Sequence, residues 1–271
     1  MTLLPTFTTL GAGPTILMLH DILGGHRAFA PQVESFAAAG YRAVAWDMPG
    51  YGHSVPIDPY TFKGLAQSCS VLIESLMQTK GGGGVILLGH GMGGMVALEV
   101  AARRPELVRR LILSGTCAVA GPADATDAAR HSWQRDYVAE CLAPLEAGLD
   151  MPALAQRVVP QVTGPNALPE GAALAVHVMA QVHPATYRRA LDAMVGFDRR
   201  SSLPEIHVPT LLIGGEADTT TAPAVMRQMA QAIAGSSYVE LPGVGHLQHL
   251  EAPDDYDGLV LNFLALPSLL Q

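Results

Sequence analysis

The segment around Gly91 has the residue pattern of a catalytic turn that lacks its catalytic residue. Residues 85–94 read Val-Ile-Leu-Leu-Gly-His-Gly-Met-Gly-Gly, so an apolar run passes into glycines and then into a helical pattern. The G-x-S-x-G nucleophile elbow needs this strand, tight turn and helix, because its central residue sits in a strained conformation between small neighbours. Gly91 stands at the central position, and glycine cannot attack a carbonyl or form an acyl-enzyme.

Four other segments of the chain match motifs of one fold in the expected order. They are Leu17–Gly25 (LMLHDILGG), Trp46–Ser54 (WDMPGYGHS), 214–218 (GGEAD) and 243–246 (GVGH). Together with the elbow they resemble the oxyanion loop, the D-x-P-G-x-G-x-S loop, the acid loop and the histidine loop of the α/β-hydrolase family. The branch that the chain resembles holds small esterases, enol-lactone hydrolases and C–C bond hydrolases. The resemblance covers nearly the whole chain.

The resemblance implies a general base and an acid that orients it. It assigns the base to His246, since an imidazole titrates near neutrality, with His249 as the weaker alternative. The acid falls on Asp218, which would accept a hydrogen bond from the imidazole ring and fix its tautomer, with Glu216 as the alternative.

The family builds its oxyanion hole from two backbone N–H groups, which here belong to Met92 and Ile22. Backbone donors survive a change of side chain, so the hole can persist without a nucleophile. Asp21 departs from the family, which usually has Gly there. A carboxylate that points inward would repel the developing negative charge. The side chain could instead point to solvent or bind a polar part of the substrate. His90 is interpreted as a support for the turn and not as a catalyst.

The alternation of apolar strand-length runs with helical patterns predicts βαβ units and a mostly parallel sheet. The resemblance sets it at about eight strands flanked by helices, in the α/β class. We expect a core domain of residues 1–117 and 201–271, and a helical cap at 118–200. The expected strands are 15–19, 43–47, 85–88, 111–114, 210–213 and 238–241, and the expected helices are 27–39, 62–77, 93–104, 224–234 and 254–264.

A cap above the sheet predicts a pocket between the two layers. Trp133, Met179 and Phe197 are the candidate substrate-binding residues of the cap, with Asp21 from the core. The cap is rich in Ala, Leu, Met and Val, so a small, mainly apolar ester, lactone or dicarbonyl compound is expected. Among the arginines, Arg27, Arg130 and Arg135 could bind a substrate carboxylate if they face the pocket.

Composition excludes several classes of protein. The chain has 271 residues, 49% of them hydrophobic and 15% charged, with a net charge of −8 and no basic cluster. Nucleic acid and membranes are therefore not expected partners, and no signal peptide or transmembrane segment is recognisable. Three cysteines without a C-x-x-C pair indicate reduced thiols and a cytoplasmic setting. We expect no metal or cofactor, and the oligomeric state stays open, with a homodimer possible.

Three hypotheses explain the glycine at position 91. The favoured one is an inactivated variant of a serine hydrolase, in which Gly91→Ser would create or restore hydrolysis. The second is a natural enzyme in which a His–Asp pair activates water, or acts as a lyase or cofactor-free dioxygenase, without covalent catalysis. Dioxygenases of this fold carry the acid after an earlier strand, and Ser114–Cys117 offers none. The third is a non-catalytic ligand-binding protein.

Overall fold

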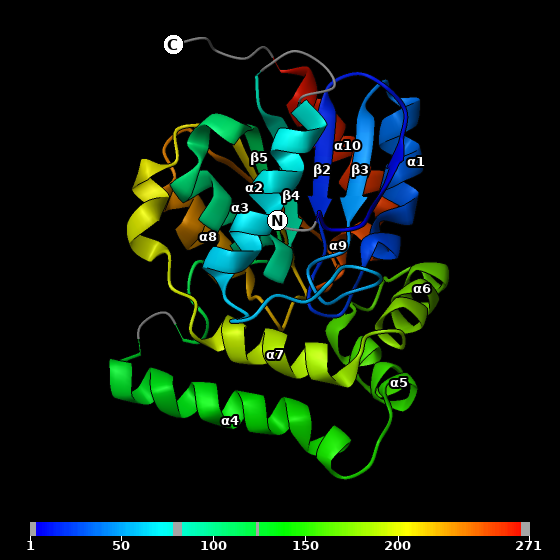
Figure 1. Cartoon of the computed structure of the whole chain (residues 1–271), viewed down its shortest axis with the longest axis vertical. Coiled ribbons are helices and arrows are strands. Elements are labelled where there is room, and N and C mark those ends of the chain that lie inside the picture. Colours follow the sequence, from blue (N-terminus) through cyan, green and yellow to red (C-terminus); the bar gives the residue numbers. More distant parts are fainter. Residues whose placement is uncertain (1–3, 78–82, 123–124, 267–271) are drawn as a thin grey trace.

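A seven-stranded sheet forms the centre of the molecule (Figure 1). The computed structural model describes residues 4–77, 83–122 and 125–266. The strand order is β1-β3-β2-β4-β5-β6-β7, and every neighbouring pair is parallel except β1 and β3. The strands are β1 (Phe7–Leu10), β2 (Thr15–Leu19), β3 (Arg42–Trp46), β4 (Val85–His90), β5 (Val108–Ser114), β6 (Thr210–Gly215) and β7 (Ser237–Leu241).

The sheet confirms the expected fold, with one strand that the sequence patterns did not indicate. All six expected strands are present, and the described residues contain seven in place of about eight. The additional strand, β1, pairs antiparallel with β3 at the edge of the sheet, and three of its four residues are exposed. It therefore lacks the buried apolar run by which the central strands are recognised. The glycine run at 81–84 lies partly outside the described residues.

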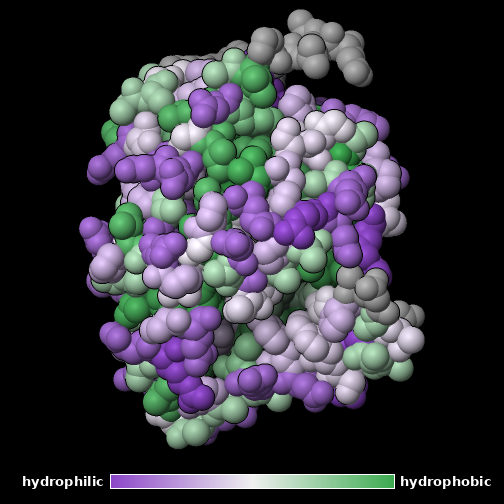
Figure 2. Space-filling view, turned by 180° about the vertical axis from the view of Figure 1, so that it is seen from behind, coloured by the Kyte–Doolittle hydropathy of each residue, from purple (hydrophilic) through white to green (hydrophobic). Residues whose placement is uncertain are grey.

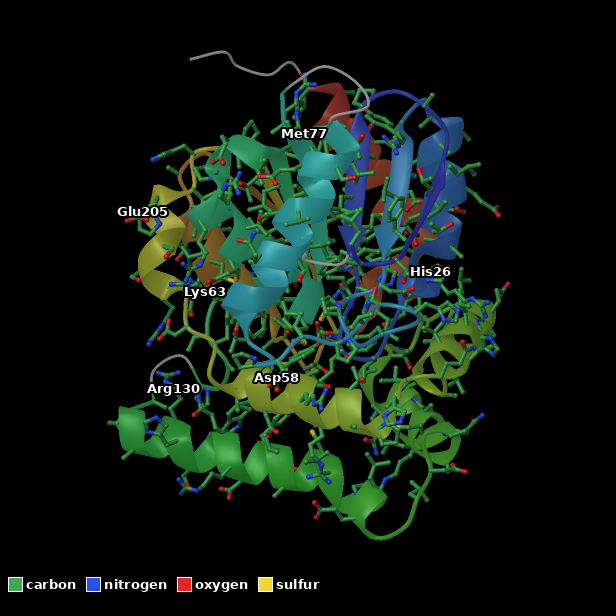
Figure 3. The ribbon with its side chains drawn as sticks, viewed as in Figure 1. His26, Asp58, Lys63, Met77, Arg130 and Glu205 are labelled. Atoms are coloured by element: carbon green, nitrogen blue, oxygen red, sulfur yellow. The ribbon has the colours of Figure 1, made fainter. Side chains whose placement is uncertain are left out.

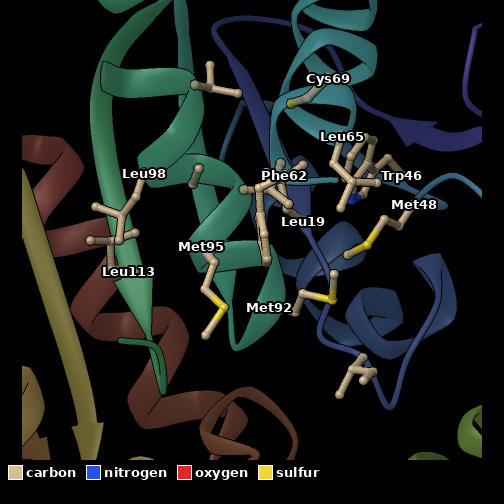
Figure 4. Packing of buried hydrophobic residues seen from close by; sticks show 14 of the residues in the cluster. Leu19, Trp46, Met48, Phe62, Leu65, Cys69, Met92, Met95, Leu98 and Leu113 are labelled. Carbon is tan, nitrogen blue, oxygen red and sulfur yellow. The ribbon is translucent and has the colours of Figure 1, made fainter. Parts of the chain in front are cut away.

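Helices cover both faces of the sheet and give it two apolar cores. Alternate residues of β2 point to opposite faces, so that Leu17 and Leu19 enter one core and Ile16 and Met18 the other. The first core includes α2 (Phe62–Met77), α3 (Met92–Arg103) and α8 (Pro223–Ala232), and part of it is drawn in Figure 4. The second contains η1 (His26–Phe29), α1 (Ala30–Ala38) and α10 (Pro253–Ala265). Burial on both faces explains why the strand sequences are uniformly apolar.

Four helices between β5 and β6 form a separate layer at one end of the sheet (Figure 1). We call this set the helical layer: α4 (Asp127–Glu146), α5 (Met151–Val162), α6 (Pro169–Met179) and α7 (Pro184–Val195). Pro169 and Pro184 are the first residues of α6 and α7, where the missing N–H costs nothing, so these prolines begin helices and do not break them. These helices lie within residues 118–200, the segment for which the sequence predicts a cap.

The chain segments that enter and leave the helical layer pair with each other beside helix α3 of the core. Val119 and Asp198 form an isolated antiparallel bridge, which brings the entering and leaving chain segments together. Beside the bridge, the buried carboxylate of Glu99 in α3 accepts hydrogen bonds from Arg199 and from Arg103. The guanidinium groups of these arginines hold the pKa of Glu99 below its ordinary value against the opposing effect of burial. This ion pair therefore ties the layer to the core helix that follows the elbow.

The surface mixes hydrophilic and hydrophobic side chains on the face shown in Figure 2. Among the described helices none combines the length and the apolar character that a membrane crossing requires. The short segments η2 (Pro105–Leu107), η3 (Arg200–Glu205) and α9 (Gln248–Glu251) complete the chain.

Candidate active site

Gly91 lies at the apex of the turn between β4 and α3, as the elbow pattern predicts. Its φ of 54° and ψ of −123° are strained for any residue with a side chain. The turn is held by hydrogen bonds from the Gly91 N–H to the Ser114 carbonyl (3.0 Å) and from the Thr116 hydroxyl to the Gly91 carbonyl (2.7 Å). Gly93 permits the close crossing of β2, because a Cβ there would lie 2.1 Å from the Leu19 carbonyl oxygen. The backbone of a nucleophile elbow is therefore present.

The carboxylate of Asp21 fills the space beside Gly91. A Cβ built on Gly91 would lie 2.1 Å from Asp21 Oδ1 and 2.4 Å from Asp21 Cγ, so the two side chains would compete for one volume. The Met92 N–H, the expected oxyanion donor, donates to Asp21 Oδ1 at 2.7 Å. Asp21 thus points inward and occupies the hole that the sequence assigned to a substrate oxygen. Ile22, the other expected donor, lines the adjacent cavity.

His246 lies between two carboxylates. Its Nδ1 is 2.9 Å from Asp218 Oδ2, and its Nε2 is 3.7 Å from Asp21 Oδ2. The other oxygen of Asp218 accepts hydrogen bonds from the backbone N–H groups of Thr220 and Thr221, both at 2.8 Å. The predicted contact between His246 and Asp218 is thus within hydrogen-bond distance, and a second acid has joined it.

The charges of this cluster set the protonation of its members. Burial lowers the pKa of His246, but Asp218 and Asp21 outweigh it and raise that pKa to about 10. Burial would raise the pKa of Asp21, but the hydrogen bond and the charge of His246 hold it well below its usual range. At neutral pH the ligand-free cluster is therefore a carboxylate–imidazolium–carboxylate unit with a net charge of −1.

A second buried histidine adjoins the cluster. The ring of His90 lies with its centroid 5.0 Å from that of His246, and its Nδ1 is 3.1 Å from the Ser114 hydroxyl. Its Nε2 is buried and has no hydrogen-bond partner among the described residues. Burial and the neighbouring His246 lower the pKa of His90 to about 4, so the ring is neutral. Asp21, His90 and His246 each place one donor atom within 4.8 Å of those of the other two.

The two alternative residues lie elsewhere. Glu216 accepts a hydrogen bond from the Gly243 N–H at 2.8 Å, and no contact with His246 is found in the described structure. His249 is buried against Phe29 and His90, outside the lining of the cavity. The geometry therefore selects Asp218 and His246 from the two pairs that the sequence left open.

A cavity of about 580 Å³ opens beside this cluster, between the sheet and the helical layer. Trp133 stacks on Tyr137, with ring centroids 4.8 Å apart, and both line the cavity. Met179 and Phe197 do not line it: Met179 is fully buried in the helical layer, and Phe197 packs on Phe62 at 4.5 Å. These two substrate-binding assignments are therefore corrected, because their side chains face the packed core.

None of the three arginines that could have faced the pocket lines the cavity in the described residues. The guanidinium of Arg130, near the start of α4 (Figure 3), donates to the carbonyls of Pro122 and Ala125. In the described residues, Arg157 is the arginine that lines the cavity, and Arg27 and Arg135 do not. Sequence reasoning also missed Tyr137 and Cys141. Their spacing of four residues along α4 after Trp133 was the available signal, because residues four apart share a helix face.

Comparison with known proteins identifies the family. The sequence profile of the alpha/beta hydrolase fold matches residues 14–253. The chain belongs to the α/β-hydrolase family. The mouse serine hydrolase BPHL is 29% identical over 256 residues, which cover 92% of this chain and 78% of that protein. A pimeloyl-[acyl-carrier protein] methyl ester esterase from Nitrosospira multiformis is 27% identical over 263 residues, covering 94% and 96%.

Solved structures of this family match the whole architecture. The crystal structure of the enol-lactonase from Burkholderia xenovorans superposes with a TM-score of 0.79 at 27% identity, covering 96% of each chain. Within the α/β-hydrolase framework, this chain has the elbow backbone and the His246–Asp218 contact. At the apex of that elbow the carboxylate of Asp21 lies beside a glycine.

Proposed function

We propose that this α/β-hydrolase cleaves small, mainly apolar esters, lactones or dicarbonyl compounds with water, and not with a side chain at position 91, as the attacking group. The observation that carries the proposal is the carboxylate of Asp21, which fills the volume of a residue-91 side chain and faces His246 Nε2 at 3.7 Å. The reacting centre is then Asp21, His246 and Asp218, in which the Asp21 carboxylate accepts a proton from the attacking water. The imidazolium of His246, held by Asp218, donates a proton to the leaving oxygen.

The cavity supports the choice of substrate. Its volume of about 580 Å³ suits a small molecule, and its lining is mostly apolar, with Asp21 and His246 at the reacting end. Two similar proteins are an esterase and an enol-lactonase, and both reactions hydrolyse a carboxylic ester. The segment 118–200 acts in this proposal as a cap that covers the substrate.

Asp21 bears on the three hypotheses for Gly91. An inactivated serine hydrolase would differ from its active parent by one hydroxymethyl group, but Asp21 already occupies the place of that group. The complementary fit of Gly91 and Asp21 supports a native arrangement, which favours the water-activating enzyme. A ligand-binding protein would have no comparable use for a buried ionised cluster beside its cavity.

The test is a hydrolysis panel of p-nitrophenyl acetate and butyrate, simple lactones and 1,3-dicarbonyl compounds. We expect steady turnover without an acyl-enzyme burst, insensitivity to serine-directed phosphonates, and loss of activity in Asp21→Asn and His246→Gln. The matched control is Glu216→Gln, an acid two residues before Asp218 that binds Gly243 and leaves the centre untouched.

Two results would overturn the proposal. A burst with a covalent acyl-enzyme would show that a side chain attacks the substrate. Tight binding of panel members without turnover would identify a ligand-binding protein.

A further inference from the structure

We propose that Asp21, His90 and His246 form a binding site for one divalent transition-metal ion of the Zn²⁺, Co²⁺ or Fe²⁺ type. The site lies beside Gly91, where the Asp21 carboxylate fills the volume of a residue-91 side chain. This inference runs against the expectation of no metal from the sequence. The three residues come from separate segments, with His90 at the end of β4 and Asp21 and His246 in the loops after β2 and β7.

The donor set has the chemistry of such a site. Two imidazoles and one carboxylate are a common ligand set for Zn²⁺ and non-haem Fe²⁺. The three donor atoms lie within 4.8 Å of one another, with 3.7 Å between His246 Nε2 and Asp21 Oδ2. Donor atoms that each lie about 2.1 Å from a shared ion are roughly 3.0–3.5 Å from one another. Movements of about 1 Å by the three side chains would therefore bring their donor atoms to coordination distance.

Each ligand is oriented by a second contact, as metal ligands usually are. Asp218 holds His246 through Nδ1, and the Ser114 hydroxyl lies 3.1 Å from Nδ1 of His90. The Met92 N–H holds Asp21 through Oδ1. These contacts leave His246 Nε2, His90 Nε2 and Asp21 Oδ2 to face the ion.

The buried ring of His90 gives a second reason to expect an ion, independent of the distances between the donor atoms. Its side chain is fully buried, yet its Nε2 has no hydrogen-bond partner among the described residues. A buried polar atom without a partner is costly, so such atoms normally have one. A coordinated ion provides that partner. The sequence assigned His90 to support of the turn. That role uses only the contact of Nδ1 with Ser114 and leaves Nε2 for the ion.

The charge of the cluster also fits a divalent ion. Asp21 and Asp218 bring two negative charges into a buried region, and both lie next to His246. A divalent cation bound by His246 and His90 balances these two charges.

The use of the ion in catalysis rests on the proposed function. Asp21, Gly91 and His246 line the cavity, so a coordination position that the protein leaves free faces the substrate. A bound water then loses a proton to solvent and adds as hydroxide to the acyl carbon, the acyl–oxygen bond breaks, and the leaving oxygen takes up a proton. The sum is ester and water giving acid and alcohol.

The test uses untagged, chelator-treated protein titrated with CoCl₂ and, separately, ZnCl₂. We expect one equivalent of Co²⁺ with visible ligand-field bands, and a rise in Tm of about 5 °C with Zn²⁺ at a hundred times Kd. Asp21→Asn and His90→Gln should each weaken binding at least tenfold. His26→Gln, at a partly exposed histidine bound to Asp47, is the control and should bind as the parent does.

Three results would overturn the metal site. Absence of saturable binding up to 1 mM Co²⁺, or equal binding by the parent and both ligand variants, overturns the site. A sulfur-to-cobalt charge-transfer band overturns it as well, because it would place the ion on Cys117 or Cys141 in the cavity. Circular dichroism of each variant shows whether it is folded.

The experiment separates this inference from the proposed function. Ion binding without hydrolysis in the metal-loaded protein refutes the function and supports the site. Hydrolysis that is unchanged by the chelator supports the function and refutes the use of an ion in it.

Discussion

Gly91→Ser should destabilise the protein instead of simply restoring a serine hydrolase. The new Cβ would lie 2.1 Å from Asp21 Oδ1, so the carboxylate must leave its place. Its displacement breaks the 2.7 Å hydrogen bond from the Met92 N–H, a charged contact worth about 1.5–3 kcal/mol. A serine at φ 54° adds about 1–3 kcal/mol of backbone strain. The expected loss in the free energy of unfolding is therefore about 3–6 kcal/mol.

The double variant Asp21→Gly/Gly91→Ser isolates the competition between the two side chains. It retains the backbone strain but has no carboxylate to displace, so its loss of stability should be smaller than the sum of the single variants by about 1.5–3 kcal/mol. It also frees the Met92 N–H and leaves His246 with Asp218. We therefore expect the double variant to show ester hydrolysis with a burst, at least about 10²-fold faster than Gly91→Ser alone.

The assays are urea denaturation followed by circular dichroism, thermal unfolding, and stopped-flow hydrolysis of p-nitrophenyl butyrate. A domain of this size loses roughly 2 °C of Tm per kcal/mol, so Gly91→Ser should melt about 6–12 °C below the parent. Additive stabilities, together with equal burst rates in the single and double variants, would refute the view that Asp21 occupies the place of a serine.

Three further variants test the fastening of the helical layer and the lining of the cavity. Glu99→Gln should cost about 1–3 kcal/mol at pH 7, because Arg199 and Arg103 lose their buried partner. The lowered pKa of Glu99 means that its contribution to stability is present above its ordinary pKa and is lost as pH falls through the lower pKa of the folded state. Urea titrations of parent and variant should therefore converge as pH falls below the ordinary pKa of Glu99, and a constant gap contradicts this. Trp133→Ala should raise KM roughly tenfold with little change in Tm, because the ring lines the cavity and is only partly buried, and an unchanged KM would remove Trp133 from the substrate contacts. Phe197→Ala should instead cost about 3–5 kcal/mol in urea denaturation with KM unchanged, and a raised KM in a stable variant would return Phe197 to the cavity.

Local patterns were enough to predict most elements of the core. The bounds of α2 (Phe62–Met77) and β2 (Thr15–Leu19) agree with the predicted ranges. Apolar periodicity and flanking glycines favour a helix or a strand through interactions among neighbouring residues, so they can be recognised in the sequence. The edge strand β1 was missed for the same reason, since its exposed residues carry no such pattern.

The prediction of the cavity residues was only partly correct. Helical spacing in the cap shows which residues share a face, but it does not show which face meets the cavity. Trp133 lines the cavity, whereas Met179 and Phe197 pack into the interior, and only the packing of the helical layer on the sheet made that distinction.

The sequence alone determined the fold, the elbow turn at Gly91 and the segments that bring His246 and Asp218 together, because motifs after parallel strands meet at one edge of the sheet. Only the tertiary structure decided what Asp21 does. Its side chain could have faced solvent, but the missing side chain of Gly91 leaves a volume beside a backbone N–H that lies 71 residues further along the chain. A carboxylate in that volume gains a donor and a cationic neighbour. The orientation of Asp21 therefore depends on a contact between segments that are far apart in the sequence, and no local pattern encodes such a contact.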